Sequence, residues 1–172
     1  IFNVLLLFGV GVSYAITPLV GAADGERNDV RIIEIFRHGL IINLINGLLL
    51  VGIVYSARNV LYFIDQPPEV VSLSIPYLTI IAGSLIPLLI FQTFKQFTEG
   101  LSNTRVAMII IIASNVVNIC LNYLLIFGHA GFPAMGLVGA GWATLLSRIF
   151  MALSFAAYIY YAPAFRKFRN GF

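Results

Sequence analysis

Residues Val106–Ser147 read VAMIIIIASNVVNICLNYLLIFGHAGFPAMGLVGAGWATLLS and contain no Asp, Glu, Lys or Arg over 42 consecutive positions. A helix needs about 20 apolar residues to cross the hydrocarbon core of a bilayer, so this stretch is long enough for two crossings. The sequence GHAGFP at 128–133 interrupts it where a turn is expected. The stretch therefore predicts two membrane-spanning helices, at about 106–127 and 137–161.

The rest of the chain has the same apolar character. Hydrophobic residues make up 60% of the 172 residues and charged residues only 10%, whereas a soluble domain has about 25% charged residues. We therefore expect an all-α, polytopic transmembrane helix bundle with five spanning helices. Their expected positions are about 1–23, 39–58, 70–95, 106–127 and 137–161.

Basic residues alternate in number along the loops, which predicts the orientation of the spans. Lys and Arg number three in Asp24–His38, one in Arg58–Glu69, two in Lys95–Arg105, none in Gly128–Gly136 and three after 165. The positive-inside rule places the first and third loops and the tail in the cytoplasm. The net charge of +3 is thus assigned to topology, and nucleic acid is excluded as a partner.

Two local features predict departures from simple straight spans. Charged and apolar residues alternate after Asp29, a candidate helix cap, so we interpret 28–38 as a short interfacial helix on the inner leaflet. The alternative, an extension of the next span, stays open. Pro18 and Pro87 each remove a backbone donor and allow bends, and the sequence DQPP at 65–68 predicts a turn.

Amide side chains within the predicted spans are candidate pathway residues. Asn115, Asn118 and Asn122 follow an i, i+3, i+7 spacing and share one helix face. They are expected to line a wet pathway or to hydrogen-bond between helices, because an unpaired polar group in lipid is costly. Asn43 and Asn46 repeat the i, i+3 spacing in the second span, where bonding between helices is the favoured interpretation.

Arg148 is expected near the middle of the last span, where an Arg costs about 2.5–3.5 kcal/mol on insertion scales. No acidic residue falls inside a predicted span, so a partner is expected from the rest of the protein, from carbonyl groups or from water. Gln92 shares a face with Lys95 and Glu99 at the cytoplasmic end of the third span. That face indicates a solvated helix end or the inner mouth of a pathway.

Motifs of enzymatic chemistry are missing from the sequence. It has no phosphate-binding glycine loop, no nucleophile elbow and a single cysteine, Cys120. His38 and His129 are expected at opposite membrane faces, so they predict no joint metal site. We expect a protein that is not an enzyme, binds no cofactor, and is driven by an ion gradient if it transports.

Several segments, in their order and spacing, resemble one transporter family. They are ITPLVGAADG at 16–25, FKQFTEGLSNTR at 94–105, NICLNY at 118–123 and GLVGAGWAT at 136–144. These segments resemble the second helix, the link between the fourth and fifth helices, the fifth helix and the start of the sixth helix of MATE (multidrug and toxic compound extrusion) transporters. The whole chain then corresponds to helices two to six of twelve, a partial N-terminal lobe at 1–172, and is expected to be a fragment.

The resemblance implies two six-helix lobes around a cavity that opens alternately to each side. It implies a secondary antiporter, multi-pass in a bacterial plasma or inner membrane, that exports organic, often cationic, drugs or toxic compounds in exchange for H⁺ or Na⁺. Its partners would be small organic substrates, membrane lipid, and the missing helix one and C-terminal lobe of its own chain.

The resemblance also implies a coupling-ion site formed by Asn118, Asn122 and Thr144 together with a helix-one carboxylate outside this chain. Some members have Asp where Asn122 stands; an amide can coordinate Na⁺ but cannot carry a proton. Two alternatives stay open: a flippase for lipid-linked sugars from the same superfamily, and a membrane scaffold that transports nothing.

Overall fold

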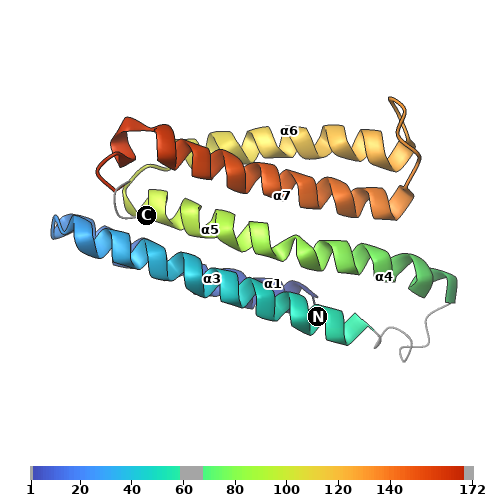
Figure 1. Ribbon diagram of the computed structural model, residues 1–172, viewed down its shortest axis with the longest axis horizontal. Coiled ribbons are helices and arrows are strands. Elements are labelled where there is room, and N and C mark those ends of the chain that lie inside the picture. Colours follow the sequence, from blue (N-terminus) through green and yellow to red (C-terminus); the bar gives the residue numbers. More distant parts are fainter. Residues whose placement is uncertain (1, 59–67, 169–172) are drawn as a thin grey trace.

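The computed structural model in Figure 1 describes residues 2–58 and 68–168, and these residues form helices and turns without a strand. The α-helices are α1 (Phe2–Tyr14), α2 (Ile16–Gly25), α3 (Asp29–Ala57), α4 (Pro68–Gly83), α5 (Leu85–Gly100), α6 (Arg105–Phe127) and α7 (Gly136–Tyr161), followed by the 3-10 helix η2 (Pro163–Phe165). The all-α bundle expected from the sequence is thereby confirmed. The turn predicted at 65–68 lies almost entirely outside the described residues.

The helices are stacked so that α4 and α5, running end to end, lie between the α6–α7 pair and the α1 and α3 helices (Figure 1). α7 packs on α4, α5 and α6, while α5 also contacts α2 and α3. α6 packs almost entirely against α7. The α6–α7 pair is therefore an antiparallel hairpin attached to the rest of the bundle mainly through α7.

Two of the predicted spans are each built from two helices that meet at a break, and both breaks follow from a proline. A proline at position i cannot donate to the carbonyl at i−4 and crowds it. α1 ends at Tyr14, four residues before Pro18, and α4 ends at Gly83, four residues before Pro87. The bends that the two prolines allow are therefore present, and they divide the first span at Ala15 and the third at Ser84.

α3 is continuous from Asp29 to Ala57, so the separate interfacial helix expected at 28–38 is not formed. Asn28, rather than Asp29, provides the N-cap, and its side chain accepts the Arg31 N–H at 3.0 Å. One buried stripe runs through both parts of the helix without a break in its helical spacing. Its members are Ile32, Phe36, Gly39, Asn43, Gly47, Leu50 and Val54. Residues 29–38 are thus an extension of the second span, as the alternative had it.

Four stretches of the described chain are long and apolar enough to cross a membrane: Asp29–Ala57, Val70–Gly100, Arg105–Phe127 and Gly136–Tyr161. The first predicted span corresponds to α1 and α2, which are 13 and 10 residues long because of the break at Ala15. Large apolar side chains remain exposed along the bundle, as a hydrocarbon solvent permits. Examples are Ile109, Ile119 and Leu153, at 61%, 68% and 64% exposure. The protein is therefore an integral membrane helix bundle.

One end of the bundle gathers the loops that the charge pattern assigns to the same side. Lys167 Nζ of the tail lies 2.6 Å from Asp29 Oδ1 beside the α2–α3 turn. Asn103 Nδ2, in the α5–α6 turn, donates to the Tyr158 hydroxyl at 3.1 Å. Phe168 is buried with its ring 5.8 Å from that of Phe97. The tail after α7 is therefore packed onto the same end of the bundle as the first and third loops.

Candidate functional site

A polar pocket of about 230 Å³ lies between α6 and α7. Its lining residues are Ser114, Asn115 and Asn118 from α6, and Thr144, Ser147, Arg148 and Met151 from α7. We refer to it as the α6–α7 pocket. All but one of its lining residues are polar, although both helices otherwise consist mainly of apolar residues. The pocket is therefore the place where the polar faces of α6 and α7 meet.

The polar faces meet because α6 and α7 approach each other closely, and Gly139 permits that close approach. A Cβ at Gly139 would lie 2.5 Å from the carbonyl oxygen of Leu125, which no side chain could tolerate without a shift of the backbone. The preceding turn is held by the Met135 N–H, which donates to the same carbonyl at 2.9 Å. Gly128 ends α6 in the left-handed conformation, with φ of 73°. Small residues and a fixed turn thus set the register of the hairpin.

The two hydroxyl groups that α7 contributes to the pocket use their protons within their own helix. Thr144 Oγ1 donates to the Ala140 carbonyl at 2.9 Å, and Ser147 Oγ donates to the Ala143 carbonyl at 2.7 Å. Their oxygen lone pairs remain as acceptors. On α6, Asn122 Nδ2 donates to Asn118 Oδ1 at 2.9 Å. The pocket therefore offers acceptor oxygens on its α7 side.

Donor groups of the pocket come from other residues. Ser114 is only 5% exposed, and its Oγ has no hydrogen-bond partner among the described residues. Arg148 is half-buried and donates from Nη1 to Ser84 Oγ, at the break between α4 and α5. Ser84 Oγ in turn donates to the Ile81 carbonyl at 2.6 Å. Arg148 thus links the α6–α7 hairpin to the bend in the third span.

No carboxylate of the described chain pairs with Arg148. The ion pairs found among residues 2–58 and 68–168 are Arg31–Glu26, Lys95–Glu99 and Lys167–Asp29. A guanidinium has five N–H donors, of which the bond to Ser84 uses one. Among the described residues that line the pocket, Arg148 is the charged one.

The structure brings together most of the residues selected from the sequence. Asn115, Asn118, Thr144 and Arg148 line the α6–α7 pocket, and Asn122 reaches it only through its bond to Asn118.

Sequence reasoning missed several residues at the pocket. Ser114 lies four positions before Asn118, and Ser147 lies three positions after Thr144, so helical spacing was a sufficient signal for both. Met151 follows the same spacing, four residues after Ser147. Ser84 is 64 residues from Arg148 and has no such signal.

The remaining candidates lie elsewhere in the bundle. Asn43 is buried, accepts from Ser13 Oγ at 3.0 Å and donates to Thr93 Oγ1 at 2.8 Å, which joins α1, α3 and α5. Asn46 Nδ2 donates to the carbonyl of Gly9 in α1 at 3.1 Å. Gln92 lies in α5, and its buried Oε1 has no partner among the described residues. None of these three lines the α6–α7 pocket.

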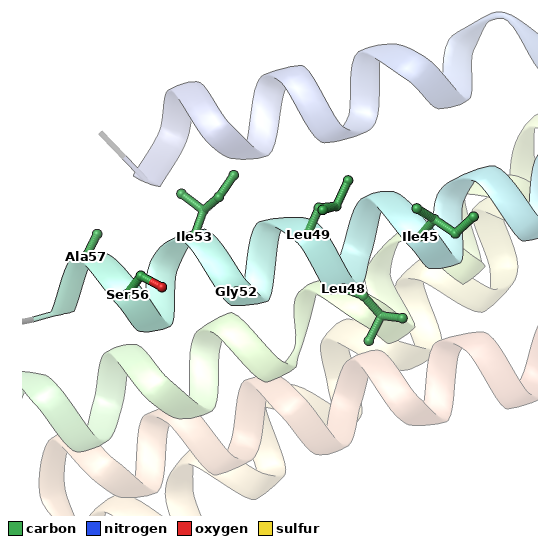
Figure 2. Close-up of a pocket in the computed structure, with 7 residues that line it drawn as sticks. All are labelled: Ile45, Leu48, Leu49, Gly52, Ile53, Ser56 and Ala57. Atoms are coloured by element: carbon green, nitrogen blue, oxygen red, sulfur yellow. The ribbon is translucent and has the colours of Figure 1, made fainter.

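A larger hollow of about 760 Å³ runs along α3 and is mostly apolar. Figure 2 shows Ile45, Leu49 and Ile53 along the side of α3 that faces α1, and Leu48 on the opposite side. Ser56 is its one polar lining residue. Its chemistry is that of a lipid-facing or helix-packing surface, so the α6–α7 pocket is the better candidate for a functional site.

The fold and the pocket together define a multi-span membrane bundle with a polar site inside its spanning part. The family model described as MatE matches residues 1–124. The chain belongs to the MatE family, as the resemblance in its sequence indicated.

Curated relatives agree with this assignment, and a solved structure shares the fold. The chain is 33% identical over 98% of its length to a probable multidrug resistance protein NorM of Rhizobium meliloti, and 34% identical over 90% to the multidrug resistance protein NorM of Photobacterium profundum. It spans 36% and 34% of those two proteins. A multidrug resistance MATE family transporter solved in an inward-facing conformation has the same fold, with a TM-score of 0.81 at 22% identity over 92% of this chain and 35% of that one.

Proposed function

We propose that this chain is part of a secondary antiporter that exports drugs or toxic organic compounds in exchange for H⁺ or Na⁺. The observation that carries the proposal is the α6–α7 pocket, a polar site inside the spanning part of a chain whose family relatives are named multidrug resistance proteins. Transport needs a wet binding site at membrane depth, and a purely apolar bundle offers none. The protein would lie in a bacterial inner membrane, with small organic compounds as substrates.

Asn118, Asn122 and Thr144 form the coupling-ion part of the proposed site. The Thr144 oxygen points a free lone pair away from its own helix bond, and the amide pair presents further oxygen and nitrogen atoms. Oxygen atoms of this kind ligate Na⁺ or hold an ordered water, whereas an amide cannot itself carry a proton. A proton-coupled mechanism therefore requires a carboxylate outside residues 1–172.

The test is efflux from cells that express the full-length protein with Asn118→Ala or Asn122→Ala. Each change is expected to lower efflux of a fluorescent cation by about tenfold at unchanged membrane abundance, because each removes one of the paired amides. Ile119→Ala is the matched control, since Ile119 lies between them in α6 with an exposed side chain. Normal efflux by both Asn variants would remove these residues from the site.

The drug susceptibility of the same cells distinguishes an exporter from a membrane scaffold that transports nothing. An exporter raises the concentration of drug needed to stop growth, and a scaffold leaves it unchanged. If the unmodified full-length protein confers no resistance and no efflux, the proposed function is wrong.

A further inference from the structure

Another hollow, of about 280 Å³, lies at the end of the bundle where α3 begins and α5 and α7 end. Helix α5 lies between α3 and α7 (Figure 1) and packs against both, so it forms the floor of the hollow. We refer to this hollow as the α3–α7 groove. Its lining residues are Phe36, Arg37 and Leu40 from α3, Phe94 from α5, and Ala156, Ile159 and Tyr160 from α7. The groove shares no lining residue with the α6–α7 pocket.

The charge pattern of α3 indicates the depth of the groove in the membrane. Residues 39–57 carry no charge, and at 1.5 Å per residue they cover about 28 Å, close to the thickness of the hydrocarbon core. Arg37 comes just before this stretch, so its guanidinium lies at the level of the lipid phosphates. Tyr160 lies near the end of α7, and tyrosine favours the same level. The basic loops assign this end of the bundle to the cytoplasm.

The groove combines an apolar floor with a guanidinium at its rim. The rings of Phe36 and Phe94 lie 5.6 Å apart on the floor. Arg37 is exposed, and none of the three ion pairs found in the described chain includes it. Glu34, one turn before Arg37, lines a different hollow, on the side of α3 that faces α1 and α2. Arg37 is therefore the charged residue that meets a ligand in the groove.

We propose that the α3–α7 groove binds an anionic phospholipid of the inner leaflet, with the phosphate at Arg37 and part of one acyl chain along the apolar floor. A planar guanidinium matches two phosphate oxygens, and basic residues at the cytoplasmic surface attract anionic lipids. The proposal concerns the membrane partner of the protein. It goes beyond the proposed function and does not depend on which compounds are transported.

Exposed apolar side chains continue the groove toward the middle of the membrane. Leu44 follows Leu40 by one turn of α3, and Leu153 precedes Tyr160 by two turns of α7, and both leucines are exposed. An acyl chain gains free energy for each methylene that it buries along such a path. A free phosphate or another small water-soluble anion would make no use of it. The surroundings of the groove therefore favour a lipid as the occupant.

The test uses purified full-length protein in detergent and two lipids with the same acyl chains, phosphatidylglycerol and phosphatidylcholine. Native mass spectrometry measures the dissociation constant of the first lipid that binds. The unmodified protein is expected to bind phosphatidylglycerol about fivefold more tightly, because the choline cation offsets the phosphate charge of the other lipid. Arg37→Gln should weaken phosphatidylglycerol binding by about fivefold and leave phosphatidylcholine binding unchanged. Arg105→Gln is the matched control, since Arg105 is an exposed arginine at the same end of the bundle and outside the groove.

A second pair of variants tests the acyl chain separately from the charge. Ala156→Phe fills the groove and leaves its charge unchanged, so it should weaken the binding of both lipids several-fold. Ala157→Phe is its control, because Ala157 is the exposed neighbour of Ala156 in α7 and does not line the groove. This control should weaken neither lipid.

The proposal is overturned if the unmodified protein binds the two lipids equally, a result that needs no variant to fold. It is also overturned if Arg105→Gln weakens phosphatidylglycerol binding as much as Arg37→Gln does, because the attraction would then belong to the whole basic end. Unchanged binding in both Arg37→Gln and Ala156→Phe would show that another part of the full-length protein covers the groove, and it would equally overturn the proposal. Efflux is measured separately in cells, so its absence would contradict the proposed function alone.

Discussion

Asn43 and Arg148 show two ways in which a polar side chain is accommodated inside this bundle. Asn43 is buried with both its oxygen and its nitrogen bonded, to Ser13 and Thr93. Arg148 lines a pocket, and its hydrogen bond within the described part of the chain is to the Ser84 hydroxyl. A side chain whose bonds are all satisfied by other helices holds the bundle together, whereas one with donors to spare is available to a ligand.

Loss of the Asn43 bonds should therefore reduce stability. Asn43→Ala removes the bridge among α1, α3 and α5, and we expect the free energy of unfolding of the full-length protein to fall by about 1 kcal/mol. Unfolding by denaturant in detergent measures it. Asn115→Ala is the matched control, because Asn115 is exposed and lies at the α6–α7 pocket. Equal unfolding free energies for the two variants would contradict the structural role of Asn43.

At the scale of the element, the sequence was sufficient to predict a helix, hairpin or bend wherever neighbouring residues alone decide it. The 42-residue uncharged stretch predicted the α6–α7 hairpin, and Pro18 and Pro87 marked the bends now seen at Ala15 and Ser84. The extent of α3 was missed because the alternation after Asp29 suits both an interfacial helix and the start of a span. Burial of Ile32 and Phe36 against the core decides between them, and that burial depends on distant residues.

Gly139 should be required for the α6–α7 hairpin. Gly139→Ala places a Cβ against the Leu125 backbone, so the helices must separate, and we expect a loss of about 1–3 kcal/mol of stability. Thermal unfolding of the full-length protein measures the loss. Gly52→Ala, in the interior of α3 with open space around its Cβ position, is the control. A variant at Gly139 as stable as the one at Gly52 would show that the helices do not approach this closely.

The bend at Ser84 should matter for activity more than for stability. Pro87→Ala restores the backbone donor for the Gly83 carbonyl, straightens the junction of α4 and α5, and moves Ser84 relative to Arg148. We expect efflux to fall several-fold while the melting temperature stays the same or rises. Pro76→Ala, which replaces a proline inside α4 and away from the break, is the control that should retain efflux. Unchanged efflux at Pro87 would show that the bend has no part in transport.

At the scale of the whole molecule, composition was enough to predict a membrane bundle, and ordered motifs were enough to predict the family. The contact between Arg148 and Ser84 was beyond sequence reasoning, because the two residues are 64 positions apart and neither helix shows a pattern that depends on the other. The same holds for the anchoring of the tail, where Lys167 meets Asp29 across 138 positions. Local periodicity predicts which face of a helix is polar but not which helix will cover it.

The account depends most on one claim, that the α6–α7 pocket is part of a wet transport pathway. The direct measurement is thiol labelling of the full-length protein in a Cys120→Ser background, with Asn115→Cys in the pocket and Ile119→Cys on the exposed apolar face of the same helix. We predict that a small water-soluble thiol reagent labels the Asn115→Cys protein and blocks its efflux, and that the Ile119→Cys protein stays unlabelled and active. Labelling at position 119 with none at 115 would contradict the account.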